Sequence, residues 1–177
     1  MCIRDSLSTV SAVSDAPTTF EFVCVRVNIS QFSAIIAVVY RPGSAAVTSV
    51  FFHELLCVLD AIATFQEPIY VVGDFNIRLE RDDDANTRQL VDLIASYGLS
   101  VLPTATTHRD GGTIDAVVVR DDMFDVQQRH SVPGGLSVSV VDVGLSDHHL
   151  LTWSVAARRP QPPTETVFRS FMAFIKH

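Results

Sequence analysis

The chain has 177 residues, of which 47% are hydrophobic and 19% charged, so it is long enough for one domain with a sizeable core and too apolar to be a disordered chain. The formal net charge of -7 argues against a simple cationic nucleic-acid binder, but not against an enzyme that holds a divalent metal ion with clustered carboxylates. No apolar run reaches the length of about 18 residues that a membrane-spanning helix needs, which predicts a chain outside the membrane.

Residues 1–17 show little periodicity and lack the basic start and apolar core of a secretory signal, so no element is predicted there. Beyond them, β-formers in alternating or continuous apolar runs predict strands, whereas apolar residues at helical spacing predict two helices. The first helix begins near Thr48 or Ser49 and ends before Pro68, and the second contains Leu90 and ends at Gly98. The predicted strands span residues 20–28, 34–40, 69–72, 99–102, 113–120, 136–143 and 150–155.

This order of elements predicts an α/β (α+β) fold, with a mixed sheet and helices packed on it. A composition shift then marks the end of the domain, because residues 157–163 are rich in proline and arginine. We therefore expect three parts: a poorly determined segment at 1–17, a domain at 18–156, and a Pro-rich linker with the start of a downstream segment at 157–177. The scattered cysteines Cys2, Cys24 and Cys57 form no CxxC pair and predict reduced thiols in an intracellular protein.

Polar residues gather where the predicted strands end, which is where active sites of α/β folds collect. They are Tyr40, Asp74, Asn76, Asp115, Asp147 and His148. Singly, each has an ordinary structural explanation: a turn, a strand cap, an ion pair, or a partly buried ring. Jointly they supply what phosphodiester hydrolysis needs, namely carboxylates for a metal ion, a positioned base, and neutral hydrogen-bond donors for the phosphate. The place of His108 by a hairpin is compatible with a contact to substrate, but a surface position is the simpler prediction.

The ordered motifs Gly73-Asp74-Phe75-Asn76, Thr113-Ile114-Asp115 and Ser146-Asp147-His148 resemble the endonuclease/exonuclease/phosphatase superfamily over about residues 20–156. Tyr40-Arg41-Pro42, and the neighbourhood of Arg169 after the Pro-rich linker, look most like the endonuclease of LINE-type (non-LTR) retrotransposons, in which a reverse transcriptase follows this domain. The resemblance implies a β-sandwich flanked by helices. Because the family's first asparagine strand and metal-binding glutamate have no match before Tyr40, we expect an N-terminally truncated chain that supplies mainly the C-terminal sheet and its helices.

The resemblance also implies roles. Asp74 would orient or deprotonate the attacking water, and Asn76 would hydrogen-bond that water or the phosphate. His148 would contact the scissile phosphate, with Asp115 fixing its ring. Tyr40 would donate to the phosphate, and Asp147 would bind or adjoin Mg²⁺ (or Mn²⁺). Whether Asp74 or His148 is the base stays open.

Three functions follow as hypotheses. The first is metal-dependent DNA nicking by a retrotransposon endonuclease domain, which would act on DNA in the nucleus and precede a reverse transcriptase in the same polyprotein. The second is a phosphatase or lipid phosphodiesterase of the same superfamily. The third is a non-catalytic remnant with a structural or interaction role. For the isolated chain we expect no activity and a tendency to self-associate, because one face of its sheet would lack a partner.

Overall fold

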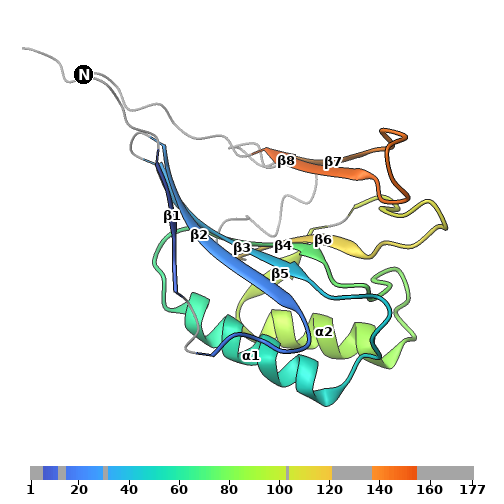
Figure 1. Cartoon of the computed structure of the whole chain (residues 1–177), viewed down its shortest axis with the longest axis horizontal. Coiled ribbons are helices and arrows are strands. Elements are labelled where there is room, and N and C mark those ends of the chain that lie inside the picture. Colours follow the sequence, from blue (N-terminus) through green and yellow to red (C-terminus); the bar gives the residue numbers. More distant parts are fainter. Residues whose placement is uncertain (1–5, 12–14, 30–31, 103, 121–136, 155–177) are drawn as a thin grey trace, which may run out of the picture.

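The computed structural model describes residues 6–11, 15–29, 32–102, 104–120 and 137–154 (Figure 1). No helix in these ranges is both long and apolar enough to cross a membrane. The elements are β1 Ser6–Thr9, β2 Glu21–Ile29, β3 Phe32–Tyr40, α1 Ser49–Ala63, β4 Ile69–Asp74, α2 Ala85–Ser96, β5 Leu99–Val101, β6 Asp115–Arg120, β7 Ser137–Val141 and β8 Leu150–Ser154.

The predicted strands from residue 20 onward and both predicted helices are present, with ends that differ by a few residues. The start of α2 shows why local chemistry decides such boundaries. Asp84 precedes the helix, and its side chain accepts hydrogen bonds from the backbone N–H groups of Asn86 and Thr87. The helix ends before Gly98, whose φ of 63° is a left-handed conformation that favours glycine. The acidic segment before α2 therefore also supplies its N-terminal cap.

The larger sheet is mixed, as the sequence predicts, with strand order β1-β2-β3-β4-β6-β5. Only the β3–β4 pair is parallel among the pairs in the described ranges, and α1 connects these two strands. The strands β7 and β8 form a separate two-stranded antiparallel sheet. Because β3 and β4 run parallel and β6 runs against them, the ends of β3 and β4 and the start of β6 share one edge of the sheet.

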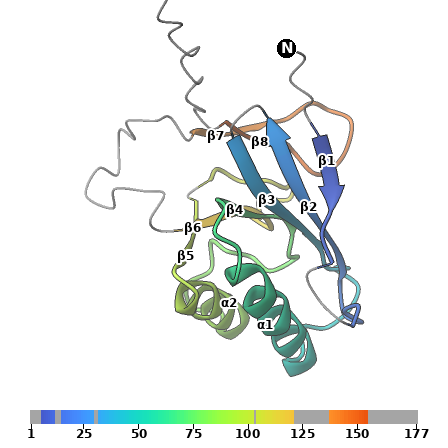
Figure 2. The same ribbon diagram turned by 90° about the vertical axis from the view of Figure 1, so that its left-hand side faces the viewer.

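The two helices cover one face of the larger sheet, and both views of the fold show them on the same side (Figures 1 and 2). The core on this face joins side chains of the central strands with the apolar stripe of α1. Ile35, Ala37 and Val39 alternate along β3 toward the helices and are fully buried, as are Val58 and Ile62 of α1. This well-covered face fixes the position of β4 and β6, which carry site residues at their ends.

The opposite face has a partner over only part of its area. Leu151 and Trp153 of β8 pack against a second core cluster that includes Tyr70 and Val117. The expectation that this face has no partner was therefore wrong over β4 and β6. The reason is that β8 has alternating exposed and half-buried residues, so one side of this small sheet is apolar and packs inward.

Toward the start of β2 and the end of β3 the same face stays open, although Ala34 near the start of β3 is buried. Val23 and Val38 are directly opposite each other in the β2–β3 register, and their exposed fractions are 54% and 40%. The described part of the chain is thus an α/β fold consisting of a six-stranded sheet, a small sheet and two helices. It agrees with a partial domain of the expected superfamily.

The strand β1 lies in the segment for which the sequence predicts no element. Ser6 to Thr9 pair with Val25 to Asn28 in antiparallel register. All four residues of β1 are exposed, so the strand is held by backbone pairing and has no apolar periodicity that a sequence pattern could detect. The predicted linker at 157–177, with Arg169, lies outside the described residues.

Candidate active site

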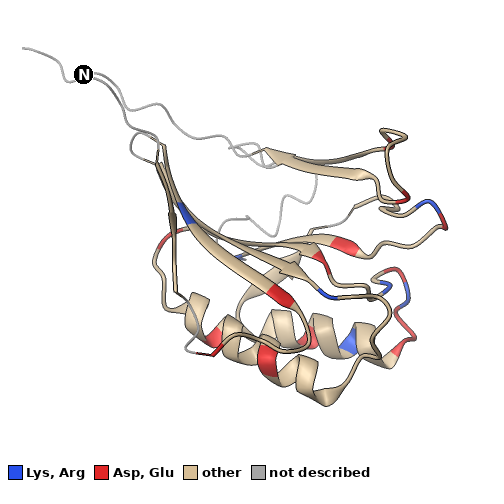
Figure 3. Ribbon diagram, in the orientation of Figure 1, with Lys and Arg blue, Asp and Glu red and all other residues tan. Residues whose placement is uncertain are grey.

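Three of the predicted site residues lie in one row across the sheet. The register of the parallel β3–β4 pair places Tyr40 opposite Asp74, and that of the antiparallel β4–β6 pair places Asp74 opposite Asp115. All three stand at the same edge, and Figure 3 shows acidic residues gathered at this end of the molecule. Sheet register alone therefore brings together residues that are up to 75 positions apart in sequence.

Asp74 is held in a tight turn with Asn76. The Asn76 backbone N–H donates to Asp74 Oδ1, and Asn76 Nδ2 donates to Asp74 Oδ2, both at 2.8 Å. The turn requires Gly73, since its φ is 140° and an added Cβ would lie 1.9 Å from the Val39 carbonyl oxygen. Asn76 itself has a φ of 48°, a left-handed conformation that asparagine tolerates. The backbone of the Gly-Asp-Phe-Asn motif therefore holds the Asp74 carboxylate in a fixed position.

Arg41 holds this turn in place with hydrogen bonds, a role that the sequence did not predict. The residue is 3% exposed, and its guanidinium donates to the carbonyl oxygens of Phe75 and Asn76, both at 2.7 Å. It also donates to the carbonyl oxygen of Ala45 at 2.7 Å. Asn76 Nδ2 in turn donates to the Arg41 carbonyl oxygen at 2.8 Å. A signal was present, because an arginine directly after an apolar strand has to find several acceptors if it is buried.

His148 belongs to the segment 147–149, whose backbone pairs with residues 107–109. The Arg109 N–H donates to the Asp147 carbonyl oxygen at 2.8 Å, and the His149 N–H donates to the Thr107 carbonyl oxygen at 2.7 Å. His108 and His148 form an isolated antiparallel bridge between these contacts. Backbone pairing thus fixes His148 relative to β6, although the two are far apart in sequence.

The His148 ring lies between two carboxylates. Its Nδ1 is 3.2 Å from Asp115 Oδ2, and its Nε2 is 3.9 Å from Asp74 Oδ2. Because an ionised carboxylate only accepts, the Asp115 contact places a proton on Nδ1 and leaves Nε2 facing Asp74. We call Asp74, Asp115 and His148 the acidic-histidine cluster. His149 turns away, with its Nδ1 3.1 Å from the Thr106 carbonyl oxygen.

Burial raises the pKa of the Asp74 carboxyl, and the negative charge of Asp115 raises it further. The hydrogen bond from the Asn76 backbone and the nearby His148 and Arg41 act in the opposite direction but do not cancel the rise. The Asp74 side chain is only 11% exposed. A largely buried carboxyl with a raised pKa, next to a histidine in a cluster of charges, is typical of a functional site.

Asp147 lies beside the cluster, at the surface. Its side chain is 64% exposed, with Oδ1 accepting from Ser146 Oγ at 3.0 Å and Oδ2 3.5 Å from His108 Nε2. The Ser146 hydrogen bond is the largest of the causes that hold the pKa of Asp147 below its ordinary value. An exposed, ionised carboxylate is free to bind a cation, which fits the role that the resemblance implies.

Tyr40 is close to Asp74 in the backbone register, but its side chain is 46% exposed and its hydroxyl has no hydrogen-bond partner among the described residues.

Thr107, by contrast, is fully buried and was not predicted. Its hydroxyl accepts from the N–H groups of Ile114 and Asp115 at 3.0 and 3.1 Å, which holds the start of β6 in place. The roles proposed for the site residues stay predictions, and the structure adds which groups hold them.

Among the described residues, two sets of side chains offer metal-binding atoms that lie within 4.8 Å of one another. One is the acidic-histidine cluster, and the other is His108, Asp147 and His148. Oxygen atoms of carboxylates predominate in the first set, and such ligands suit a hard divalent cation. The residues present therefore fit a divalent metal ion.

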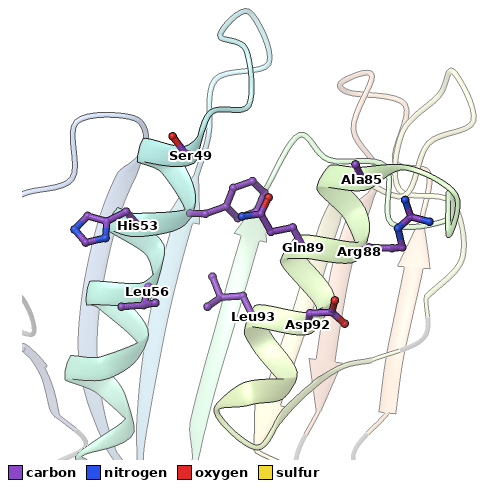
Figure 4. Close-up of a pocket in the computed structure, with 9 residues that line it drawn as sticks. Ser49, His53, Leu56, Ala85, Arg88, Gln89, Asp92 and Leu93 are labelled. Atoms are coloured by element: carbon purple, nitrogen blue, oxygen red, sulfur yellow. The ribbon is translucent and has the colours of Figure 1, made fainter.

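A concavity lies between α1 and α2 (Figure 4). It is lined by side chains of both helices, among them His53, Leu56, Arg88 and Asp92. His53 is exposed there. No group of three metal-binding side chains within the described ranges includes any of these residues, so the chemistry gathers at the sheet edge instead.

The comparison with protein families gives a match to the model described as Endonuclease/Exonuclease/phosphatase family, over residues 3–148. Members of this family usually use a divalent metal ion, in agreement with the donor groups above. No curated protein sequence matches the chain.

Three solved structures have a similar fold at low sequence identity. The endonuclease domain of TRAS1, a telomere-specific non-LTR retrotransposon, has a TM-score of 0.64 at 15% identity, covering 85% of this chain and 67% of that one. A 3′ phosphatase from Neisseria bound to a product DNA hairpin has a TM-score of 0.55 at 20% identity, covering 86% and 72%. A family protein from Leptotrichia buccalis has a TM-score of 0.55 at 11% identity, covering 87% and 61%. The chain thus spans between 61% and 72% of the length of these structures.

Proposed function

Because this chain belongs to the endonuclease/exonuclease/phosphatase family, we propose that its acidic-histidine cluster takes part in hydrolysis of DNA phosphodiester bonds, as in the endonuclease domain of a LINE-type retrotransposon. The observation that carries the proposal is the place of His148, with Nδ1 3.2 Å from Asp115 and Nε2 3.9 Å from Asp74. A purely structural histidine has no need of two half-buried carboxylates, one of which has a raised pKa.

Each residue has a task in the proposed reaction. Asp74, fixed by Asn76, orients or deprotonates the attacking water, and its raised pKa suits a base that works closer to neutral pH. His148 presents Nε2 to the scissile phosphate, because Asp115 holds its Nδ1. Tyr40, whose side chain is exposed at the same edge, donates to a phosphate oxygen. Asn76 Nδ2 is engaged with Asp74 and Arg41, so its contact with the phosphate or the water requires one of these bonds to be exchanged.

Asp147 is the proposed ligand of Mg²⁺ or Mn²⁺, and His148 links it to the acidic-histidine cluster, because His148 belongs to both sets of metal-binding side chains. A bound divalent cation screens the charge of the phosphate and stabilises the leaving oxygen. The hard oxygen donors favour Mg²⁺ or Mn²⁺ over softer metals.

Two further features support the retrotransposon assignment. Tyr40-Arg41-Pro42 resembles the corresponding segment of LINE-type retrotransposon endonucleases. Arg41 of this segment is the buried residue that holds the Asp74 turn in place. The TRAS1 endonuclease domain has a similar fold. On this proposal the domain acts on DNA in the nucleus and is followed by a reverse transcriptase in the same polyprotein.

The test uses the longest natural chain that carries these 177 residues, with supercoiled plasmid, a phosphate monoester and a phospholipid as substrates, each with Mg²⁺ and with chelator. Metal-dependent nicking of plasmid that Asp74→Asn abolishes supports the proposal. Release of phosphate or lipid headgroup without nicking contradicts it and favours a phosphatase or lipid phosphodiesterase. Absence of turnover on all three substrates contradicts it in favour of a non-catalytic remnant.

A further inference from the structure

His108 was expected to be a surface residue, but it lies against two residues of the proposed site. Its side chain is 18% exposed. Its Nε2 is 3.5 Å from Asp147 Oδ2, and its ring meets the His148 ring edge-on, with centroids 5.1 Å apart and an interplanar angle of 90°. One imidazole therefore touches both side chains that the 146–149 segment brings to the site.

The hydrogen bonds of His108 define its tautomer. The Asp110 backbone N–H donates to His108 Nδ1 at 3.1 Å, so Nδ1 has a lone pair and carries no proton. The proton of a neutral ring is then on Nε2, where Asp147 Oδ2 is an acceptor within 3.5 Å. The hydrogen bond from the Asp110 backbone therefore leaves His108 Nε2–H as a donor toward Asp147.

The same tautomer argues against His108 as a metal ligand, although it belongs to a set of metal-binding atoms with Asp147 and His148. Binding a metal ion through Nε2 would move the proton to Nδ1. That proton would then point at the Asp110 N–H, and two donors would face each other at 3.1 Å, while the Asp110 carboxylate is farther off, with Oδ2 3.9 Å from Nδ1. His108 is better placed to hold a ligand than to be one.

Resting on the proposed function, we infer that His108 is a positioning residue of the site: it orients Asp147 through Nε2–H and fixes the His148 ring by edge-on packing. Asp147 needs such a partner because its side chain is exposed, and Ser146 Oγ is its other described side-chain donor. The His148 ring is held at Nδ1 by Asp115, and His108 restricts its tilt from a second side. Substitution of groups of this kind, which contact metal ligands and not the ion, typically lowers metal affinity or activity by about 10- to 100-fold.

Two variants separate the two contacts. His108→Phe keeps an aromatic ring against His148 and removes the donor, whereas His108→Gln keeps an N–H within reach of Asp147 and removes the ring. His53→Phe, on the exposed surface of α1, is the matched control. Each variant is made in the longest natural chain that carries these 177 residues. We would measure Mn²⁺ binding in the absence of DNA by the electron paramagnetic resonance signal of the free ion, the kcat and KM of plasmid nicking, and the melting temperature.

We expect His108→Phe to weaken Mn²⁺ binding by about 10-fold or more and to raise the Mg²⁺ concentration for half-maximal nicking by a similar factor. His108→Gln should retain Mn²⁺ affinity within about threefold, and lower kcat more than it raises KM, because the His148 ring has lost its support. The control should behave as wild type. Wild-type metal binding and kcat in His108→Phe would overturn the inference while leaving the proposed function standing.

The tautomer gives a test that is independent of activity and of any substitution. In ¹⁵N nuclear magnetic resonance spectra of the wild-type chain, His108 should show an unprotonated Nδ1 and a protonated Nε2. A neutral ring with its proton on Nδ1 would overturn the inference, even in a protein that nicks DNA. A wild-type chain that neither nicks DNA nor binds Mn²⁺, yet shows the expected tautomer, would instead count against the proposed function.

Discussion

Two regions of the molecule hold a carboxylate with hydrogen bonds, and the two carboxylates are perturbed in opposite directions. On α1, the Glu54 carboxylate accepts from the backbone N–H and the hydroxyl of both Thr18 and Thr19, at 2.6–2.9 Å. Burial raises its pKa, but these four hydrogen bonds outweigh it and lower the pKa to about 2. At the sheet edge, burial and Asp115 raise the pKa of Asp74 despite the hydrogen bond from Asn76.

The opposite pKa shifts mean that the charged form of Glu54 stabilises the folded state, whereas the charged form of Asp74 destabilises it. Glu54 ties the segment before β2 to α1, and its charged form is favoured in the folded state. Asp74 is largely buried, beside a second carboxylate, so its charged form is disfavoured there. An arrangement that costs stability at neutral pH calls for a functional reason, and hydrolysis at the acidic-histidine cluster supplies one.

Removal of the metal ion should give the largest contrast between the two regions. Excess chelator should abolish nicking, because the proposed ligands at the sheet edge are hard oxygen donors. The melting transition should change little, since the Glu54 contacts require no ion. Nicking at the full rate in excess chelator would contradict a metal-dependent mechanism.

Asp74→Ala should lower the nicking rate by about 10² or more, the usual scale for a positioned base. Glu54→Gln is the matched control and should leave the rate near that of wild type, because Glu54 contacts only Thr18 and Thr19 among the described side-chain partners. Rates are compared by the conversion of supercoiled to open-circular plasmid. An Asp74→Ala variant with unchanged turnover would remove Asp74 from the catalytic residues.

The two carboxylates should also give opposite pH dependence of stability. The stabilisation from Glu54 is present above its ordinary pKa of 4.5 and is lost as the pH falls toward about 2. Asp74 binds its proton more tightly when folded, so its contribution is present below its ordinary pKa of 3.8 and is lost as the pH rises through the raised value.

Denaturant unfolding from pH 2 to pH 7 checks both signs. Glu54→Gln should lower the free energy of unfolding at pH 7, by less than about 1 kcal/mol because the group lies near the surface, and the deficit should shrink at low pH. Asp74→Asn should gain stability relative to wild type as the pH rises above 3.8. The same sign of pH dependence at the two sites would break the comparison.

A smaller effect is expected from the uncovered part of the sheet. Val23 and Val38 present adjacent apolar side chains that are about half exposed, and such a patch favours association. Val23→Thr should reduce self-association of the 177-residue chain in sedimentation experiments, whereas Val91→Thr on α2 should not. Equal association of wild type and Val23→Thr would show that this face is not the one that associates.

The sequence predicted the elements best where one physical pattern dominates. The buried run of β4 and the apolar stripe of α1 are visible as periodicity, and Gly73 and Gly98 mark backbone turns. β1 could not be found, because its exposed residues are held only by backbone pairing with β2. The packing of Trp153 on Tyr70 depends on tertiary contacts that no local pattern encodes.

Within the site, motif residues were easier to predict than the groups that hold them. Asp74, Asp115 and His148 stand in recognisable motifs at strand ends, and the structure brings them together. Arg41 and Thr107 act through backbone carbonyl and N–H groups, so their contribution depends on the fold of segments remote from them. His108 was assigned to the surface, because the bridge that brings it to His148 joins residues 40 positions apart.

The central claim is that Asp115 and His148 act as one unit at the proposed site, and a double-mutant cycle of the nicking rate tests it most directly. Rates would be measured for wild type, Asp115→Asn, His148→Asn and the double variant, with folding verified by circular dichroism. Each single variant should lose about 10² in rate, and the double variant should lie within about threefold of the slower single variant, because either change removes the same function. Losses that multiply in the double variant would contradict the account.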